Sequence, residues 1–162
     1  MAMTSSQQLQ KVLQAEQYIA AQLLDILTAE RDALMRSESD TIEKMSADKQ
    51  PLTVQLEQLG RQREAILKAG GFSADKEGLE AFIANQNDVD THQLQNLLQQ
   101  LRDTAHACRE NNQINGGIVN VNRQYLHQAM SVLRGRDMNI TSYGPGGEYA
   151  SQIVRQPLIG RV

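Results

Sequence analysis

Residues 94–133 read LQNLLQQLRDTAHACRENNQINGGIVNVNRQYLHQAMSVL, and this stretch decides the fold. Apolar or small residues recur in it every three or four positions, the spacing of one buried helix face. The positions on this face are Leu94, Leu98, Leu101, Ala105, Cys108, Asn112, Asn115, Val119, Asn122, Leu126, Ala129 and Leu133. The three- and four-residue spacing of these positions continues unbroken across Gly116-Gly117, whereas a loop would interrupt it. The pattern therefore predicts one helix over residues 89–134, about 70 Å long.

The pair Gly116-Gly117 lies inside this predicted helix, where each glycine costs about 1 kcal/mol relative to alanine. It marks either a flexible point or the close approach of another helix. Two shapes follow from these interpretations, a straight rod with a soft point and a kinked helix. The unbroken phase of the apolar positions favours the rod.

The C-terminal half of the predicted helix is apolar on a second face as well. This row contains Ile114, Ile118, Val121, Tyr125 and, one turn later, Met130 or Val132. The other predicted helices are shorter than this one, so part of its apolar surface is expected to lack a partner within the chain. Exposed apolar patches of this kind usually mark an interaction site.

Two further helices and a connector are predicted upstream. Apolar periodicity predicts helices over residues 6–36 and 41–69, and a short helical connector within residues 72–85. The residues expected to anchor the connector to the core are Leu79, Phe82 and Ile83.

Local signals add detail to the two upstream helices. Glu16 and Glu30 interrupt the apolar stripe of the first helix, and each is expected to lie at its edge or to face a wet groove. Asp40 is expected to cap the second helix, with Glu43 three residues on as the capping-box partner. Pro51 falls inside that helix and predicts a kink rather than a loop, because the heptad phase continues past it.

The chain after the long helix lacks a helical period. Gly144-Pro145-Gly146-Gly147 predicts a turn, across which residues 138–143 and 148–154 could pair as a small hairpin. A flexible tail over residues 136–162 is the preferred interpretation. We therefore expect an all-α protein with a helical bundle over residues 1–135. The bundle should be elongated and antiparallel, with three long helices and a short connector helix.

Composition and charge exclude several classes of function. The formal net charge is −3, the pI is about 5.6, aromatic residues make up 4% and Trp is absent, which argues against a nucleic-acid binder. No run of 18 apolar residues occurs, so no membrane insertion is expected. The first residues do not resemble a secretory signal. Cys108 is the single cysteine and cannot form an internal disulfide, which favours a cytoplasmic location.

No residue pattern predicts catalysis, a metal site or a cofactor. Asp103, His106 and Glu110 share one helix face, but a metal site in a bundle needs such ligands from more than one helix, and the two upstream helices contain no histidine. A solvated face with local ion pairs is the preferred interpretation. Cys108 lies on the core stripe and is interpreted as a small buried hydrophobe. An enzyme with a metal site in the bundle is therefore disfavoured.

Three stretches are similar to one family. Asn115-Gly116-Gly117-Ile118, followed by residues 123–133, resembles the C-terminal helix of FlgN-type flagellar export chaperones. Tyr143-Gly144-Pro145-Gly146-Gly147 resembles the Tyr-Gly-x-x-Gly element that follows this helix in the family. Glu43-Lys44, with residues 52–63 behind it, is similar to the second helix of the family.

The resemblance implies an all-helical cytoplasmic chaperone. Such proteins bind unassembled hook–filament junction proteins and deliver them to the cytoplasmic domain of the flagellar export-gate protein. The positions that match the client-binding helix of the family are Ile114, Ile118, Val121, Tyr125, Leu126, Met130 and Leu133. The positions that match the gate-docking element are Tyr143, Gly144 and Gly147. The free protein is expected to be a monomer or a weak homodimer.

Two alternatives to this interpretation stay open. The sustained heptads would also suit a coiled-coil oligomerisation or adaptor protein without a client, whose seam would include Leu126 and Leu133. A sibling flagellar chaperone, specific for the filament-cap protein or for flagellin, is the nearer alternative. The Tyr-Gly-x-x-Gly element after the long helix favours the junction-protein class.

Overall fold

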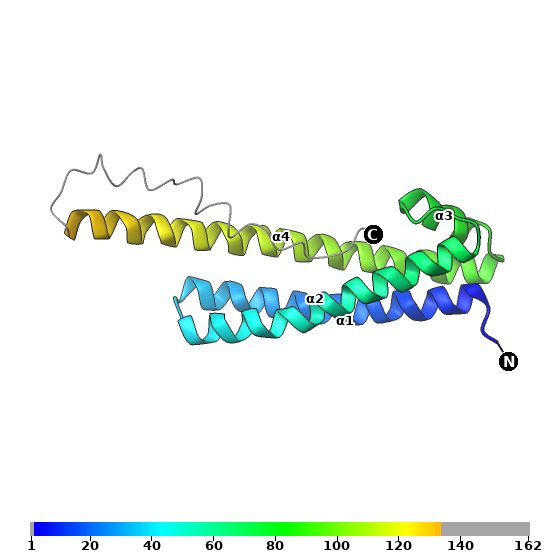
Figure 1. The fold of residues 1–162 in the computed structure, drawn as a ribbon, viewed down its shortest axis with the longest axis horizontal. Coiled ribbons are helices and arrows are strands. Elements are labelled where there is room, and N and C mark those ends of the chain that lie inside the picture. The colour runs from blue at the N-terminus through cyan, green and yellow to red at the C-terminus, as the bar shows by residue number, and fades with distance from the viewer. Residues whose placement is uncertain (1, 134–162) are drawn as a thin grey trace.

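The computed structural model describes residues 2–133, which form four helices and no strand. These helices are α1 (Ser5–Met35), α2 (Ser39–Ala69), α3 (Lys76–Ala84) and α4 (Asp88–Leu133). The described part of the chain is thus all-α, as predicted, and α4 is one helix across the diglycine. Figure 1 shows α4 as a long, straight rod. The predicted tail, turn and hairpin lie outside the described residues.

The helix ends follow local capping, with one prediction wrong. Thr4 caps α1 through a capping box, because its side chain accepts from the backbone N–H of Gln7 and the Gln7 side chain accepts from the Thr4 N–H. At α2 the cap residue is Glu38, without a side-chain hydrogen bond, rather than the predicted Asp40. Asp40 lies within the first helical turn, where a carboxylate favours the helix dipole. The connection from α1 is very short, which starts α2 before Asp40 can act as a cap.

α1 is the helix against which both α2 and α4 pack. Consecutive long helices are antiparallel, so α1 and α4 run side by side in the same direction (Figure 1). Three side-chain contacts between α1 and α4 join residues 87 or 88 positions apart. They link Gln17 to Thr104, Ala20 to Cys108 and Leu27 to Asn115. This nearly constant offset fixes the register of α4 on α1.

The hydrophobic core lies toward the α3 end of the bundle. Its buried members are Leu9, Leu13, Ala20, Leu23, Leu27, Leu56, Leu67, Leu79, Phe82, Ile83, Leu94, Leu98, Leu101 and Cys108. The connector anchors on α3 are buried, as predicted, and the ring of Phe82 meets that of Phe72 edge to face at 5.3 Å. α2 continues through Pro51, which confirms that this proline does not interrupt the helix with a loop, and the kink stays a prediction.

Cys108 belongs to the core, as its place on the stripe predicts. Its side chain is fully buried, and Sγ lies 3.5 Å from the carbonyl oxygen of Ala20. Burial raises the pKa of the Cys108 thiol to about 11, because the thiolate would lose its hydration. The thiol therefore packs as a small apolar group and is unreactive at neutral pH.

The sequence placed Glu16 at the edge of the apolar stripe or facing a wet groove. In the structure, Glu16 is instead buried within the stripe. Arg63 of α2 is buried opposite, and its Nη1 donates to both carboxylate oxygens of Glu16 at 2.6 and 2.7 Å. Burial raises the pKa of Glu16, although Arg63 partly offsets this effect by its charge and its hydrogen bonds. The expectation was wrong because the partner of Glu16 comes from another helix, 47 residues away.

The Glu16–Arg63 contact predicts an asymmetric response to mutation. Glu16→Ala removes the carboxylate that Arg63 contacts, and should lower the free energy of unfolding by about 3–5 kcal/mol. The double variant Glu16→Leu/Arg63→Met replaces the ion pair with apolar side chains and should recover most of that loss. Urea unfolding followed by circular dichroism measures both values. Equal losses in the single and double variants would contradict a buried ion pair at this place.

Candidate functional site

The distal part of α4 extends beyond the helices that support it. The α1–α4 register places Met35, the last residue of α1, level with Arg123 of α4. The ten residues from 124 to 133 continue for about 15 Å past that point. Figure 1 shows this end of α4 reaching beyond the turn between α1 and α2. The longest helix therefore has a segment that α1 cannot cover.

The apolar residues of this part of α4 are exposed. We call the predicted client-binding set, Ile114, Ile118, Val121, Tyr125, Leu126, Met130 and Leu133, the distal α4 face. Six of its seven members are exposed, among them Tyr125 at 68%, Leu126 at 63% and Leu133 at 84%, and Ile118 is half-buried. Val132, an alternative to Met130 in the predicted row, is exposed as well. Large exposed apolar side chains gathered on one helix segment are typical of an interaction surface.

Beyond Asn115, none of the residues predicted for the core stripe is buried. Leu126 and Leu133 continue the stripe in sequence but are exposed, and Val119 is only half-buried. The physical reason is the end of α1, since beyond it the stripe loses the helix that it packs against. Both apolar rows of distal α4 are therefore accessible, whereas the periodicity alone left only one row without a partner.

A buried polar contact holds α4 just before this segment. Asn115 is buried, and its Nδ2 donates to the carbonyl oxygen of Leu27 at 2.9 Å and to Oε1 of Glu30 at 3.0 Å. Oε2 of Glu30 lies 2.7 Å from Nζ of Lys49, so one carboxylate joins α1 to both α2 and α4. One turn earlier, Arg31 donates to the side chain of Asn111. Glu30 was expected at the edge of its stripe, and that expectation is wrong for the same reason as for Glu16.

Gly116 and Gly117 follow Asn115 directly, and the space that a side chain would occupy at each glycine is empty. A Cβ placed on Gly116 or Gly117 meets no heavy atom within 4 Å, apart from the local helix backbone. Of the two interpretations of the pair, close approach of another helix is therefore excluded among the described residues. Each glycine still costs the helix about 1 kcal/mol. The flexible point is the interpretation that remains.

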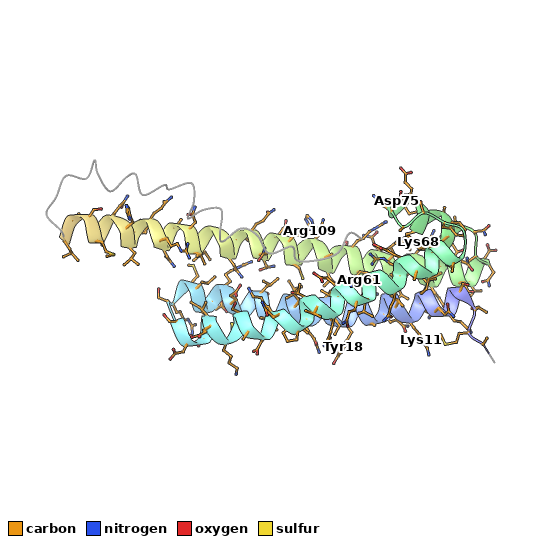
Figure 2. The ribbon with its side chains drawn as sticks, viewed as in Figure 1. Lys11, Tyr18, Arg61, Lys68, Asp75 and Arg109 are labelled. Carbon is orange, nitrogen blue, oxygen red and sulfur yellow. The ribbon has the colours of Figure 1, made fainter. Side chains whose placement is uncertain are left out.

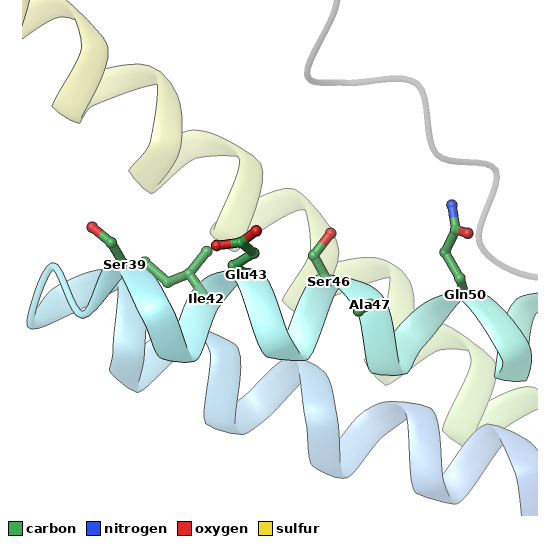
Figure 3. Close-up of a pocket in the computed structure, with 6 residues that line it drawn as sticks. All are labelled: Ser39, Ile42, Glu43, Ser46, Ala47 and Gln50. Carbon is green, nitrogen blue, oxygen red and sulfur yellow. The ribbon is translucent and has the colours of Figure 1, made fainter.

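A shallow groove runs along the N-terminal half of α2. It is lined by Ser39, Ile42, Glu43, Ser46, Ala47 and Gln50, whose side chains lie along one face of the helix (Figure 3). Four of its six lining residues have polar side chains, and Ile42 is its one large apolar side chain. Sequence reasoning did not find this groove, because no motif or apolar run marks it.

Metal chemistry finds no support in the described part of the chain. No group of three or more His, Cys, Asp or Glu side chains gathers within residues 2–133. His106 and Glu110 form an exposed pair with 3.3 Å between Nε2 and Oε1, which is the local ion pair predicted for this face.

None of the four helices is both long and apolar enough to cross a membrane. The predicted gate-docking residues Tyr143, Gly144 and Gly147 lie outside the described residues.

Comparisons with known proteins point to one family. The model of the FlgN protein family matches residues 1–151 of this chain. A solved structure of a flagella synthesis protein FlgN from Pseudomonas aeruginosa is 31% identical, with a TM-score of 0.64. That match covers 74% of this chain and 90% of the Pseudomonas chain. A comparison with curated proteins returns no match.

The exposure of the distal α4 face predicts different costs for two leucines of one helix. Leu126→Ala should change the free energy of unfolding by less than about 0.5 kcal/mol, because Leu126 is exposed. Leu101→Ala should cost about 2–5 kcal/mol, because Leu101 is fully buried. Urea denaturation of the two variants tests this. A similar loss in both would mean that Leu126 is packed in the protein.

Proposed function

The chain belongs to the FlgN family of flagellar chaperones, and from this premise we propose that it holds unassembled hook–filament junction proteins in the cytoplasm and delivers them to the flagellar export gate. The observation that carries the proposal is the exposed distal α4 face. A chaperone of this kind needs an accessible apolar surface before its client arrives. It needs no catalytic group, and the proposal includes no cofactor.

The distal α4 face suits an amphipathic client helix. Tyr125 and Leu126 are adjacent and exposed, with Val121 one turn before them and Met130 one turn after Leu126. An apolar client side chain buried against this surface would contribute about 1.5–3 kcal/mol. Three or four such side chains, at helical spacing, would match both rows of the face, which is the pattern of a helix bound to a groove or a bundle.

Delivery to the export gate is assigned to the Tyr-Gly-x-x-Gly element. Tyr143, Gly144 and Gly147 match this element by sequence, and Tyr143 is only ten residues after the last residue of α4. A contact with the cytoplasmic domain of the gate protein through this element would therefore use residues outside the distal α4 face. The chaperone could then hold the client and the gate at the same time.

The exposed seam also favours a second candidate function, self-association. Val119, Leu126 and Leu133 are spaced by seven residues, as at one position of a coiled-coil heptad. A second copy of the chain could cover this seam. A dimer that is stable to dilution and excludes junction proteins would favour an oligomerisation role over the chaperone role.

Client binding predicts a contrast between two exposed tyrosines. Tyr125→Ser should weaken binding to a purified junction protein at least tenfold, because burial of the ring contributes more than about 1.4 kcal/mol. Tyr18→Ser is the matched control, since Tyr18 is 65% exposed on the outer surface of α1 (Figure 2). Isothermal titration calorimetry measures both affinities, and thermal melting should show both variants folded. Equal affinities for the two variants would place the client elsewhere.

The docking element predicts a loss of export without a loss of client binding. Tyr143→Ala should leave the affinity for the junction proteins unchanged, because Tyr143 is not part of the distal α4 face. Secretion of the junction proteins by cells that carry this variant should fall. Tyr149→Ala, a tyrosine outside the element, is the control. Normal secretion with Tyr143→Ala would remove the proposed role in docking.

A further inference from the structure

α3 takes the space between α2 and α4 at one end of the bundle only. It has nine residues, packs on both helices and buries Leu79, Phe82 and Ile83 in the core. Figure 1 shows it beside the end of α2 and the beginning of α4. Since α2 and α4 also pack on α1, α3 holds the fourth position of a bundle whose other positions are long helices. Farther along α2 and α4, no helix within residues 2–133 takes this position.

Arg123, His127 and Ser131 lie along one stripe of α4, on the side that α3 occupies nearer the start of the helix. Arg102 marks this side, because its Nη2 lies 3.1 Å from Oε1 of Glu80 in α3. His127 and Ser131 follow Arg102 by 25 and 29 residues, about seven and eight helical turns, so they point to the same side. Arg123 comes one turn before His127. We call these three residues the 123–131 stripe.

The groove on α2 lies at the level of this stripe. Glu30 contacts Lys49 of α2, and the α1–α4 register places Glu30 level with Ile118 of α4. Because α2 and α4 are antiparallel, Glu43 of the groove is therefore about level with Arg123. In Figure 3 the polar side chains that line the groove point away from α1. An acidic side chain on α2 and a basic one on α4 thus flank the fourth position.

Ser131 is buried although the helices that pack on α4 stop short of it. It is 7% exposed, whereas its neighbours Met130 and Val132 are 43% and 69% exposed. α1 ends level with Arg123, about 12 Å before Ser131, and α3 lies at the other end of the bundle. Each residue of the 123–131 stripe has an interaction partner. Burial beyond the last supporting helix indicates that another part of the chain covers this side of α4.

We infer that the chain after Leu133, residues 134–162, folds back on the 123–131 stripe and fills the fourth position of the bundle where α3 does not reach. Its 29 residues suffice, because Arg123 is only about 15 Å back along α4 and an extended chain spans about 3.1 Å per residue. The segment offers acidic residues to Arg123 and arginines to Glu43. These are Asp137 and Glu148, and Arg134, Arg136, Arg155 and Arg161.

Docking on the stripe leaves the distal α4 face accessible. Tyr125 is two residues before His127, which places the two side chains about 160° apart around the helix. Leu126 is five residues before Ser131 and about 140° from it. A client and the C-terminal segment would therefore occupy different sides of α4. The segment would also support α4 beyond the end of α1, whatever the identity of the client.

Thiol alkylation of the full-length protein tests whether Ser131 is covered. Ser131→Cys keeps the size of the side chain, and Ala129→Cys puts a matched thiol at an exposed position two residues away. A maleimide should modify Ser131→Cys at least tenfold more slowly, while the buried thiol of Cys108 stays unmodified. Arg123→Glu should raise the rate at Ser131→Cys at least threefold, because it repels the acidic residues of the segment. Lys11→Glu, on the exposed surface of α1, should leave that rate unchanged (Figure 2). Equal rates at the two cysteines would overturn the coverage of Ser131.

Double electron–electron resonance identifies the segment that covers Ser131. Spin labels at Lys44→Cys, exposed on α2 outside the groove lining, and at Ser151→Cys report the distance from the bundle to the segment. A docked segment should give a narrow distance distribution within one chain. An undocked segment would give a broad one, because the 18 residues from Leu133 to Ser151 would span about 21–25 Å as a flexible coil. A broad distribution would overturn docking. So would a narrow one that appears only between chains labelled at single positions, since a second copy would then cover the stripe.

Charge reversal in the doubly labelled protein tests how the segment is held. Arg123→Glu should broaden the distance distribution, and the further change Asp137→Lys/Glu148→Lys should narrow it again, because opposite charges then face each other with their signs exchanged. Lys11→Glu is the control and should not change the width. Circular dichroism should show the same helix content in every variant. A width that stays the same in all of them would overturn the pairing of the acidic residues with the 123–131 stripe.

Discussion

The lengths of α1 and α4 differ, and this difference determines which part of α4 is exposed. α4 has 46 residues and α1 has 31, and the two run in parallel with a nearly constant offset of 87 or 88 positions. α1 is the helix on which both α2 and α4 pack, so α4 loses its support where α1 ends. The apolar pattern of α4 nevertheless continues to Leu133. The result is an apolar surface that the helices of the bundle leave accessible.

Buried polar contacts on α1 maintain this arrangement. Glu16 binds Arg63 of α2, Gln17 bonds to Thr104 of α4, and Glu30 joins Lys49 and Asn115. A slip of α4 by one turn along α1 would separate Gln17 from Thr104 and Asn115 from Glu30, and would leave buried polar atoms without hydrogen bonds at a cost of about 1–3 kcal/mol for each. Apolar contacts between leucine-rich helices tolerate such slips more easily. The polar contacts therefore define where the supported part of α4 ends.

Predictions from the sequence succeeded where the determining signal was local. The four helices begin and end within a few residues of the predicted positions, because apolar periodicity depends only on neighbouring turns. The burial of Cys108 and of the α3 anchors followed from the same periodicity. The cap of α2 was missed, because the brevity of the α1–α2 connection overrode the preference of Asp40 for a cap position. Glu16 and Glu30 were misplaced, because their partners come from distant parts of the chain.

The sequence by itself determined the all-α class, the single long helix across Gly116-Gly117 and the residues that form its apolar rows, since each depends on spacing within one helix. Only the tertiary structure decided which parts of those rows are covered. Leu101 and Leu126 occupy equivalent positions on one stripe, yet Leu101 is fully buried and Leu126 is 63% exposed. Periodicity places a residue on a face, but burial also requires a second helix opposite it, and the end of α1 at Met35 limits how far that helix extends.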